Sequence, residues 1–212
     1  MRTEHHQPNR DLFSSTPVEK LFERPLIVGA SVSADWLAES PGRKLALRYT
    51  KPHHIKTIAF GGRPGLQVLK SVTKADLEDR TIIIGVDLFF WDSTLPSADA
   101  SIKALHELVK QTQELDIPLV LGEIPELIPE RQPSLAVLNQ ALSKVSSVHG
   151  HCHLMLFNQL MHQILEDGHL HIRGRNYSIP DLVPDGLHLG EIAGEFLADR
   201  LLSSIAPSML PS

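Results

Sequence analysis

The chain has 212 residues, of which 42% are hydrophobic and 21% are charged, and its formal net charge is −5. This length suits one domain with a full core, and the composition is ordinary for a soluble globular protein. The acidic balance gives no reason to expect nucleic acid as a partner. No apolar run approaches the roughly 20 residues that span a bilayer, so we expect no membrane insertion. The single cysteine, Cys152, excludes an internal disulfide. Because no signal peptide is apparent either, we expect a cytoplasmic protein.

After a polar arm over residues 1–24, the sequence alternates between strand-like and helix-like segments and indicates a single domain over 25–206. Apolar runs predict five strands, at 26–28, 55–60, 81–86, 117–121 and within 151–156. Helical segments are expected at 34–39, 66–72, 99–115, 134–146, 158–166 and 189–204. A break is expected at Ser40-Pro41-Gly42 and a small hairpin at 169–179. The buried stripe of the last helix is predicted to be Ile192, Phe196, Leu197 and Leu201.

This alternation predicts a parallel five-stranded sheet covered on both faces, a three-layer α/β/α sandwich. In such sheets ligands bind at the carboxyl ends of the strands. Ser31 lies just after the first strand, where a serine hydroxyl is exposed beside free backbone N–H groups and becomes a nucleophile. The alternative is that Ser31 only caps the following helix.

A second candidate site lies near the C-terminus, at Asp185-Gly186-Leu187-His188. An Asp three residues before a His can accept a hydrogen bond from its Nδ1–H, which leaves Nε2 as a base for a serine proton. The alternative is a turn that stabilises the start of the last helix.

Together these segments resemble the SGNH hydrolases, the superfamily of GDSL-like esterases and lipases, from residue 25 to about residue 204. The family's Gly-Asp-Ser-Leu-Ser block corresponds to Gly29-Ala30-Ser31-Val32-Ser33. In this alignment Ser31, rather than Ser33, takes the place of the nucleophile. The family's Asp-x-x-His block corresponds to residues 185–188, which implies a triad of Ser31, His188 and Asp185 on a flavodoxin-like fold.

The same resemblance implies an oxyanion hole from the backbone N–H of Ser31, a glycine after the second strand and residue 87. Spacing favours Gly65 as that glycine, with Gly62 next. Asp87 stands where the family has Asn, and an ionised Asp accepts hydrogen bonds but donates none. Four alternatives remain open: Asp87 is protonated, it points elsewhere, another residue supplies the donor, or activity is weak.

The resemblance therefore implies a serine hydrolase that cleaves a small acyl ester through an acyl-enzyme, with no metal or organic cofactor. The alternative is a catalytically degenerate protein of the same fold that binds a small-molecule ligand without turnover. Ala30 beside Ser31, in place of the family's Asp, and Asp87 favour this alternative. The oligomeric state is left open by the sequence.

Aromatic residues near these motifs are candidates for a substrate pocket. Phe89 and Trp91, which follow the third strand, either line this pocket or belong to the core. A histidine cluster, His149, His151 and His153, has the alternation of a strand face, and imidazoles are good metal ligands. No carboxylate lies within this cluster and it overlaps a core strand, so we expect no metal site.

Overall fold

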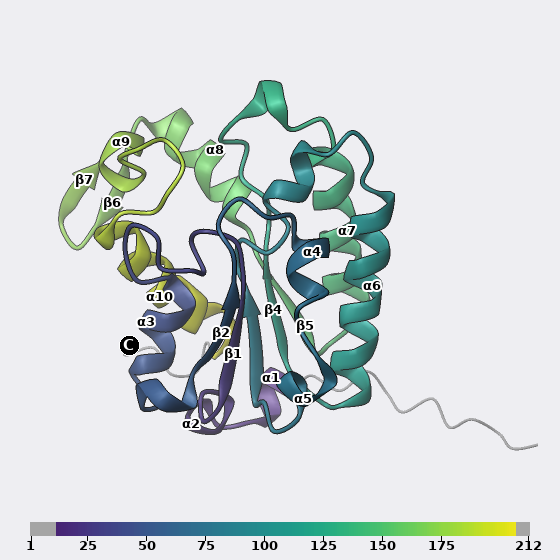
Figure 1. Cartoon of the computed structure of the whole chain (residues 1–212). Coiled ribbons are helices and arrows are strands. Elements are labelled where there is room, and N and C mark those ends of the chain that lie inside the picture. The colour runs from purple at the N-terminus through teal and green to yellow at the C-terminus, as the bar shows by residue number, and fades with distance from the viewer. Residues whose placement is uncertain (1–11, 207–212) are drawn as a thin grey trace, which may run out of the picture.

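The computed structural model describes residues 12–206, so residues 1–11 of the expected arm lie outside the described range (Figure 1). Five parallel strands form the central sheet in the order β2-β1-β3-β4-β5. Their bounds are β1 Pro25–Gly29, β2 Lys56–Ala59, β3 Ile82–Gly85, β4 Leu119–Gly122 and β5 Cys152–Met155. All five lie within or at the edge of the predicted segments. The predicted parallel five-stranded sheet is therefore confirmed.

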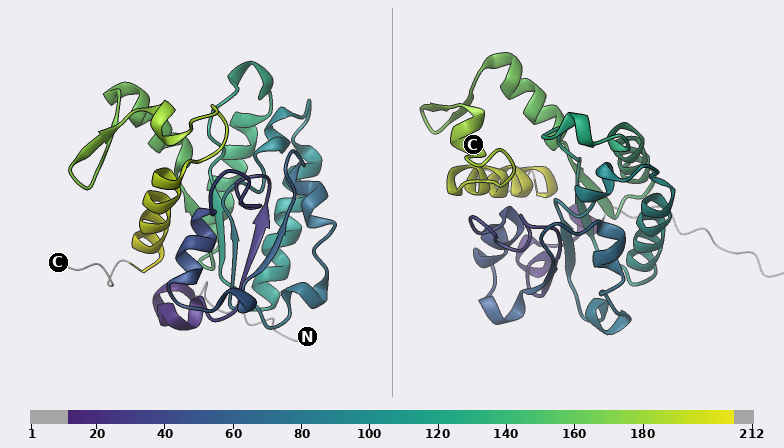
Figure 2. Two further views of the ribbon diagram at one scale, coloured as in Figure 1. Left: turned by 60° about the vertical axis from the view of Figure 1, so that its left-hand side comes forward. Right: turned by 45° about the horizontal axis from the view of Figure 1, so that its top comes forward.

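Helices cover both faces of this sheet, as the two views of Figure 2 show. On one face, α3 (Pro41–Leu47) packs along α10 (Glu191–Ile205). The other face carries α4 (Gly65–Leu69), α6 (Asp99–Glu114) and α7 (Leu135–Val148). A shorter helix, α5 (Lys74–Leu77), adds Leu77 to the core of the second face. The predicted three-layer α/β/α sandwich is thus confirmed.

Strand β3 illustrates why the two faces need apolar residues throughout. Ile83 belongs to the core on the side of α6 and α7, whereas Ile82 and Ile84 belong to the core on the side of α10. Successive side chains of a strand point to opposite faces, so a strand covered on both faces is apolar at every position. All three isoleucines are fully buried.

Two short helices precede the sheet, α1 (Leu12–Ser15) and α2 (Val18–Leu21), within the stretch expected to be a polar arm. Phe13 and Leu21 are buried in the same core as the inward side of α10. Residues 12–24 are therefore packed against the sheet. Short 3₁₀ helices interrupt the loops at Pro52–His54, Trp91–Thr94 and Pro129–Arg131.

The helix predicted at 34–39 is wrong, and a helix begins where a break was expected. Asp35 has a left-handed backbone, with φ of 56°, and its carboxylate accepts the N–H of Ser40 at 2.7 Å. Ser40 is the N-cap of α3, and its hydroxyl accepts the N–H of Arg43. Pro41 occupies the first turn, where its missing N–H removes no hydrogen bond. The Ser-Pro pair is therefore a start signal.

Residues 157–183, which we call the cap, lie beside the carboxyl-terminal edge of the sheet (Figure 1). The cap comprises α8 (Phe157–Asp167), a hairpin of β6 (Leu170–Ile172) and β7 (Arg175–Tyr177), and α9 (Ile179–Leu182). Its apolar core includes Ile164 and Leu182 and continues onto α10 through Ala193. The predicted hairpin is confirmed, but Ile192, expected to be buried on α10, is 40% exposed.

Across the described residues, every helix is too short or too polar to cross a membrane.

Candidate active site

Ser31 lies in the tight turn that follows β1, at the carboxyl-terminal edge of the sheet. Its carbonyl accepts the N–H of Trp36 at 3.1 Å, and the carbonyl of Ala30 accepts the N–H of Ala34 at 3.0 Å. These bonds fold the chain back on itself before α3 begins. Ser31 is 8% exposed. Within residues 12–206 its own N–H donates to no protein acceptor, which keeps that donor available to a ligand.

The carboxylate of Asp87, just after β3, holds this turn from the neighbouring strand. Oδ1 accepts the N–H of Ala30 at 3.1 Å, and Oδ2 accepts the N–H groups of Val32 and Ser33 at 2.8 and 3.2 Å. Thus the residues on both sides of Ser31 donate to one side chain. Asp87 acts as an acceptor at both oxygens, so its contacts support a role in positioning the turn rather than the expected role in the oxyanion hole.

Ser33 completes this arrangement through its side chain. Its hydroxyl lies 2.5 Å from Oδ1 of Asp87 and 3.4 Å from the carbonyl oxygen of Val28. Ser33 is 1% exposed, so its hydroxyl is out of reach of a substrate. Burial raises the pKa of Asp87 above its ordinary value, and the hydrogen bonds from Ser33, Ala30 and Val32 act in the opposite direction.

Gly29 makes room for the Asp87 carboxylate, because a Cβ at this position would overlap both Oδ1 of Asp87 and the Ser33 side chain. We expect Gly29→Ala to lower the free energy of unfolding by about 1–3 kcal/mol, the usual range for overpacking. Urea unfolding measures this change. Gly61→Ala is the control, since a Cβ there would meet its nearest neighbour at 3.5 Å. Equal stability of the two variants would contradict the close approach.

Asp185 and His188 form the contact that their spacing predicts. Nδ1 of His188 lies 2.6 Å from Oδ2 of Asp185, while Oδ1 accepts the N–H groups of Leu187 and His188 at 3.0 and 2.7 Å. These bonds, led by the His188 backbone N–H, lower the pKa of Asp185 to about 2. The carboxylate is therefore ionised over the whole neutral range. Because Asp185 occupies Nδ1, Nε2 of a neutral His188 is left as a proton acceptor.

Trp36 links the serine turn to the histidine. Its ring stacks on that of His188, with centroids 6.1 Å apart and an interplanar angle of 19°. A Cβ built on Gly61 would lie 3.5 Å from Cε3 of Trp36 and 3.7 Å from Cβ of Ser31. Ser31, Gly61 and Trp36 thus meet at one place, and the Trp36 ring also stacks on that of His188. Within residues 12–206 no hydrogen bond joins Ser31 to His188, a common feature of catalytic groups without substrate.

Gly65 differs from its expected role. Its N–H and that of Leu66 donate to the buried carboxylate of Asp92, which also accepts the hydroxyl of Ser101 at 2.6 Å. A Cβ on Gly65 would overlap the carbonyl oxygen of Leu88, so this glycine permits a close approach of two backbones. The Gly65 N–H is therefore committed to Asp92 and is not free to bind an oxyanion. Burial raises the pKa of Asp92.

The other glycine considered, Gly62, lies in the exposed turn after β2 with φ of 73°. This turn begins at Gly61, beside Ser31. Within residues 12–206 the N–H groups of Gly61 and Gly62 donate to no protein acceptor. Within the described residues, the turn that begins beside Ser31 therefore has two backbone donors with no protein partner.

The expected aromatic pocket residues are placed differently. Phe89 is 3% exposed and belongs to the main core, and Trp91 packs against the same core. Phe90, between them, instead lines a cavity that also contacts Ser31 and Asp87. The choice among the three could not be predicted from the sequence, because the turn after β3 is irregular and has no side-chain period.

The histidine cluster has structural contacts. Nε2 of His151 lies 3.2 Å from both the Thr112 hydroxyl and the Val109 carbonyl, and burial lowers the pKa of His151. In the described part of the chain no three His, Cys, Asp or Glu side chains gather as metal ligands would. Cys152 is 5% exposed, and burial raises its thiol pKa to about 12, so it is not an activated nucleophile.

No family model matches the sequence, and no curated protein matches it either. Solved structures do match the fold. The psychrotrophic esterase EstA of a Pseudoalteromonas species superposes with a TM-score of 0.60 at 19% identity, over 87% of this chain and 97% of that chain. The acetylxylan esterase Axe2 of Geobacillus stearothermophilus gives 0.60 at 16% identity, over 87% and 94%.

A GDSL-like lipase of Bacteroides thetaiotaomicron matches with a TM-score of 0.53 at 11% identity, over 93% of this chain and 95% of that chain. These structures are esterases and a lipase, and the alignments cover 87–93% of this chain. At such low identity the similarity concerns architecture. The chain therefore has the fold of the SGNH hydrolases.

Proposed function

We propose that this protein is a serine hydrolase that cleaves a small-molecule carboxylic ester. Ser31 Oγ attacks the carbonyl carbon while Nε2 of His188 takes its proton. The same imidazolium then protonates the leaving alkoxide oxygen, and a water molecule, deprotonated by His188, releases the acyl group from Ser31. Asp185 keeps His188 in the required tautomer and balances its positive charge.

The observation that carries this proposal is the Asp185–His188 contact of 2.6 Å at the same sheet edge as a serine in a turn held by Asp87. A merely structural turn needs the Asp185 bonds to backbone N–H groups but not the bond to the imidazole. The similarity to esterases in fold supports the same reaction class.

The tetrahedral oxyanion needs donors that are not bound elsewhere. We assign this role to the backbone N–H of Ser31 and to the turn of Gly61 and Gly62, because Gly65 is bound by Asp92. The N–H groups of the same turn donate hydrogen bonds to the Asp87 carboxylate and offset part of its negative charge. This limits the repulsion between Asp87 and the oxyanion.

A fluorophosphonate probe tests the activated nucleophile directly, and the Pseudoalteromonas esterase was crystallised after inhibition by a monoethylphosphonate. We expect stoichiometric labelling, located at Ser31 by mass spectrometry of the digested protein. His188→Ala is expected to slow labelling by about 10²-fold or more, the usual contribution of a general base. His162→Ala is the control, since His162 lies on the exposed side of α8 near Glu126. Absence of labelling in the wild-type chain would favour a protein that binds esters without hydrolysing them.

A further inference from the structure

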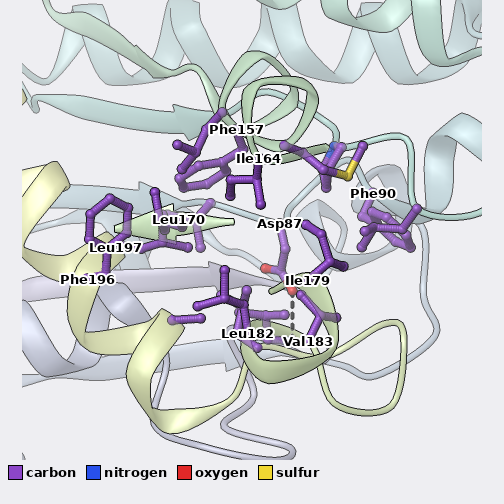
Figure 3. A pocket seen from close by; sticks show the side chains of 18 of the residues that line it. Asp87, Phe90, Phe157, Ile164, Leu170, Ile179, Leu182, Val183, Phe196 and Leu197 are labelled. Carbon is purple, nitrogen blue, oxygen red and sulfur yellow. Dashed lines mark hydrogen bonds between the residues drawn. The ribbon is translucent and has the colours of Figure 1, made fainter. Parts of the chain in front are cut away.

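A cavity of about 120 Å³ lies between the carboxyl-terminal edge of the sheet, the cap and α10. Of residues 12–206, twenty line it, and only Ser31 and Asp87 among these have polar side chains. Figure 3 shows Asp87 surrounded by apolar side chains, with Phe157 and Ile164 from α8, Leu170 from the hairpin and Leu182 from α9. The two polar residues therefore belong to the sheet edge, and the rest of the wall is apolar.

The lining determines which chemical group fits. Sugar hydroxyls would lose their hydrogen bonds to water there without finding partners, because both oxygens of Asp87 are already bound to the Ser31 turn. An apolar chain has no hydrogen bonds to water to lose, and its transfer from water into the cavity lowers the free energy. A dry apolar cavity of about 150 Å³ holds the six carbon atoms of a benzene molecule, so this cavity of about 120 Å³ has room for about five carbon atoms. An acetyl group would leave most of it empty.

The position of His188 determines which half of an ester lies inside. His188 has to deliver a proton to the leaving oxygen, and it is not among the residues that line the cavity. Its ring lies under Trp36, which is 70% exposed. The alcohol half of the ester is therefore on the open side, at Trp36, and the acyl half extends from Ser31 under the cap.

We propose that this cavity binds the acyl chain of a medium-length fatty ester, with about five carbon atoms beyond the carbonyl carbon. The inference rests on the proposed hydrolase function, and it changes the expected substrate from a small acyl ester to a medium-chain one. The cap, whose apolar residues form the wall, acts as the part of the chain that selects acyl length.

The test is hydrolysis of p-nitrophenyl acetate, butyrate, hexanoate, octanoate and decanoate. Since burial of a methylene is worth about 0.8 kcal/mol, kcat/KM is expected to rise about fourfold per methylene until the cavity is full. The maximum should lie at hexanoate or octanoate. Ala193→Phe, which fills the cavity from α10, is expected to lower the hexanoate-to-acetate ratio at least tenfold. The adjacent Ile192→Phe is the control, because Ile192 is 40% exposed and does not line the cavity.

Two further measurements keep the outcome clear. Leu170→Trp obstructs the same cavity from the half-exposed hairpin, where a larger side chain is tolerated, and is expected to shift the preference in the same direction as Ala193→Phe.

Binding of methyl hexanoate to Ser31→Ala, measured by calorimetry, tests the cavity without turnover. If this binding is lost in the Ser31→Ala, Ala193→Phe double variant while no ester is hydrolysed by the wild type, the hydrolase function fails and the cavity assignment stands. Equal rates on acetate and hexanoate, unchanged by either variant, would overturn the acyl-chain proposal even in an active hydrolase.

Discussion

Replacement of Ser31 by Ala is expected to lower kcat/KM for p-nitrophenyl butyrate by about 10⁴- to 10⁶-fold, the range found when a catalytic serine is removed. No other side chain of the site can substitute for it. Ser33 is 1% exposed and its hydroxyl is bound to Asp87, and the buried thiol of Cys152 has a pKa raised to about 12. The residual rate should be that of uncatalysed hydrolysis within a bound complex.

The fold should survive this substitution, because the Ser31 hydroxyl makes no hydrogen bond within residues 12–206. We expect the free energy of unfolding to change by less than about 0.5 kcal/mol in urea titrations. Ser146→Ala is a matched control, since its hydroxyl binds only the Cys152 carbonyl, at 3.3 Å, away from the site. Wild-type turnover in Ser31→Ala, once a contaminating esterase is excluded by active-site titration, would refute the mechanism.

The architecture follows from local sequence patterns. Strands β1, β3 and β4 are apolar runs, and the segments between the strands of the sheet have helical spacing, which suffices to predict a doubly covered parallel sheet. The failure at 34–39 is also local. The sequence predicts a helix there, whereas the N-cap at Ser40 and the left-handed backbone of Asp35 place the helix start at Pro41. Such helix-start signals depend on one or two residues. In a prediction they are easily outweighed by the composition of the whole segment.

The site was predictable only where its contacts are close in sequence. Asp185 and His188 are three residues apart, so spacing alone indicates their hydrogen bond. The bond from Ala30 to Asp87 spans 57 positions, and that from Gly65 to Asp92 spans 27. Nothing in the sequence says which backbone N–H a distant carboxylate will bind. The acyl cavity is harder still to predict from the sequence, because its wall comes from the cap, the sheet edge and α10 together.

The resemblance to a family pattern left the role of Asp87 open for the same reason. Because Asp87 stands where the family has an Asn that donates to the oxyanion, one expectation placed Asp87 in the oxyanion hole. In the structure its carboxylate instead binds the turn that in the family contains its own Asp, at the position of Ala30 here. The carboxylate beside the nucleophile of this chain therefore comes from the turn after β3.

Asp87→Asn consequently should impair catalysis, although it restores the residue of the family pattern. An Asn has one acceptor oxygen, whereas the two oxygens of Asp87 accept from Ala30 on one side and from Val32 and Ser33 on the other. If the amide oxygen of Asn faces Ala30, the amide NH₂ group faces the N–H groups of Val32 and Ser33. Those two buried donors then lose their acceptor. An unsatisfied buried group costs about 1–3 kcal/mol, so we expect a loss of about this size in the free energy of unfolding.

The effect on the reaction should exceed this loss of stability, because the unsatisfied groups are the immediate neighbours of Ser31. A displacement of the nucleophile by about 1 Å lowers rates by about 10²-fold, so kcat is expected to fall between 10- and 100-fold with KM little changed. Asp92→Asn separates the two effects, since Asp92 also accepts two backbone N–H groups but holds Gly65 and Leu66 rather than the serine turn. It should destabilise the fold comparably while keeping most of kcat at temperatures where the protein is folded. A higher kcat in Asp87→Asn would mean that the carboxylate acts chiefly by repelling the oxyanion, and that its contacts with the Ser31 turn are dispensable for positioning the nucleophile.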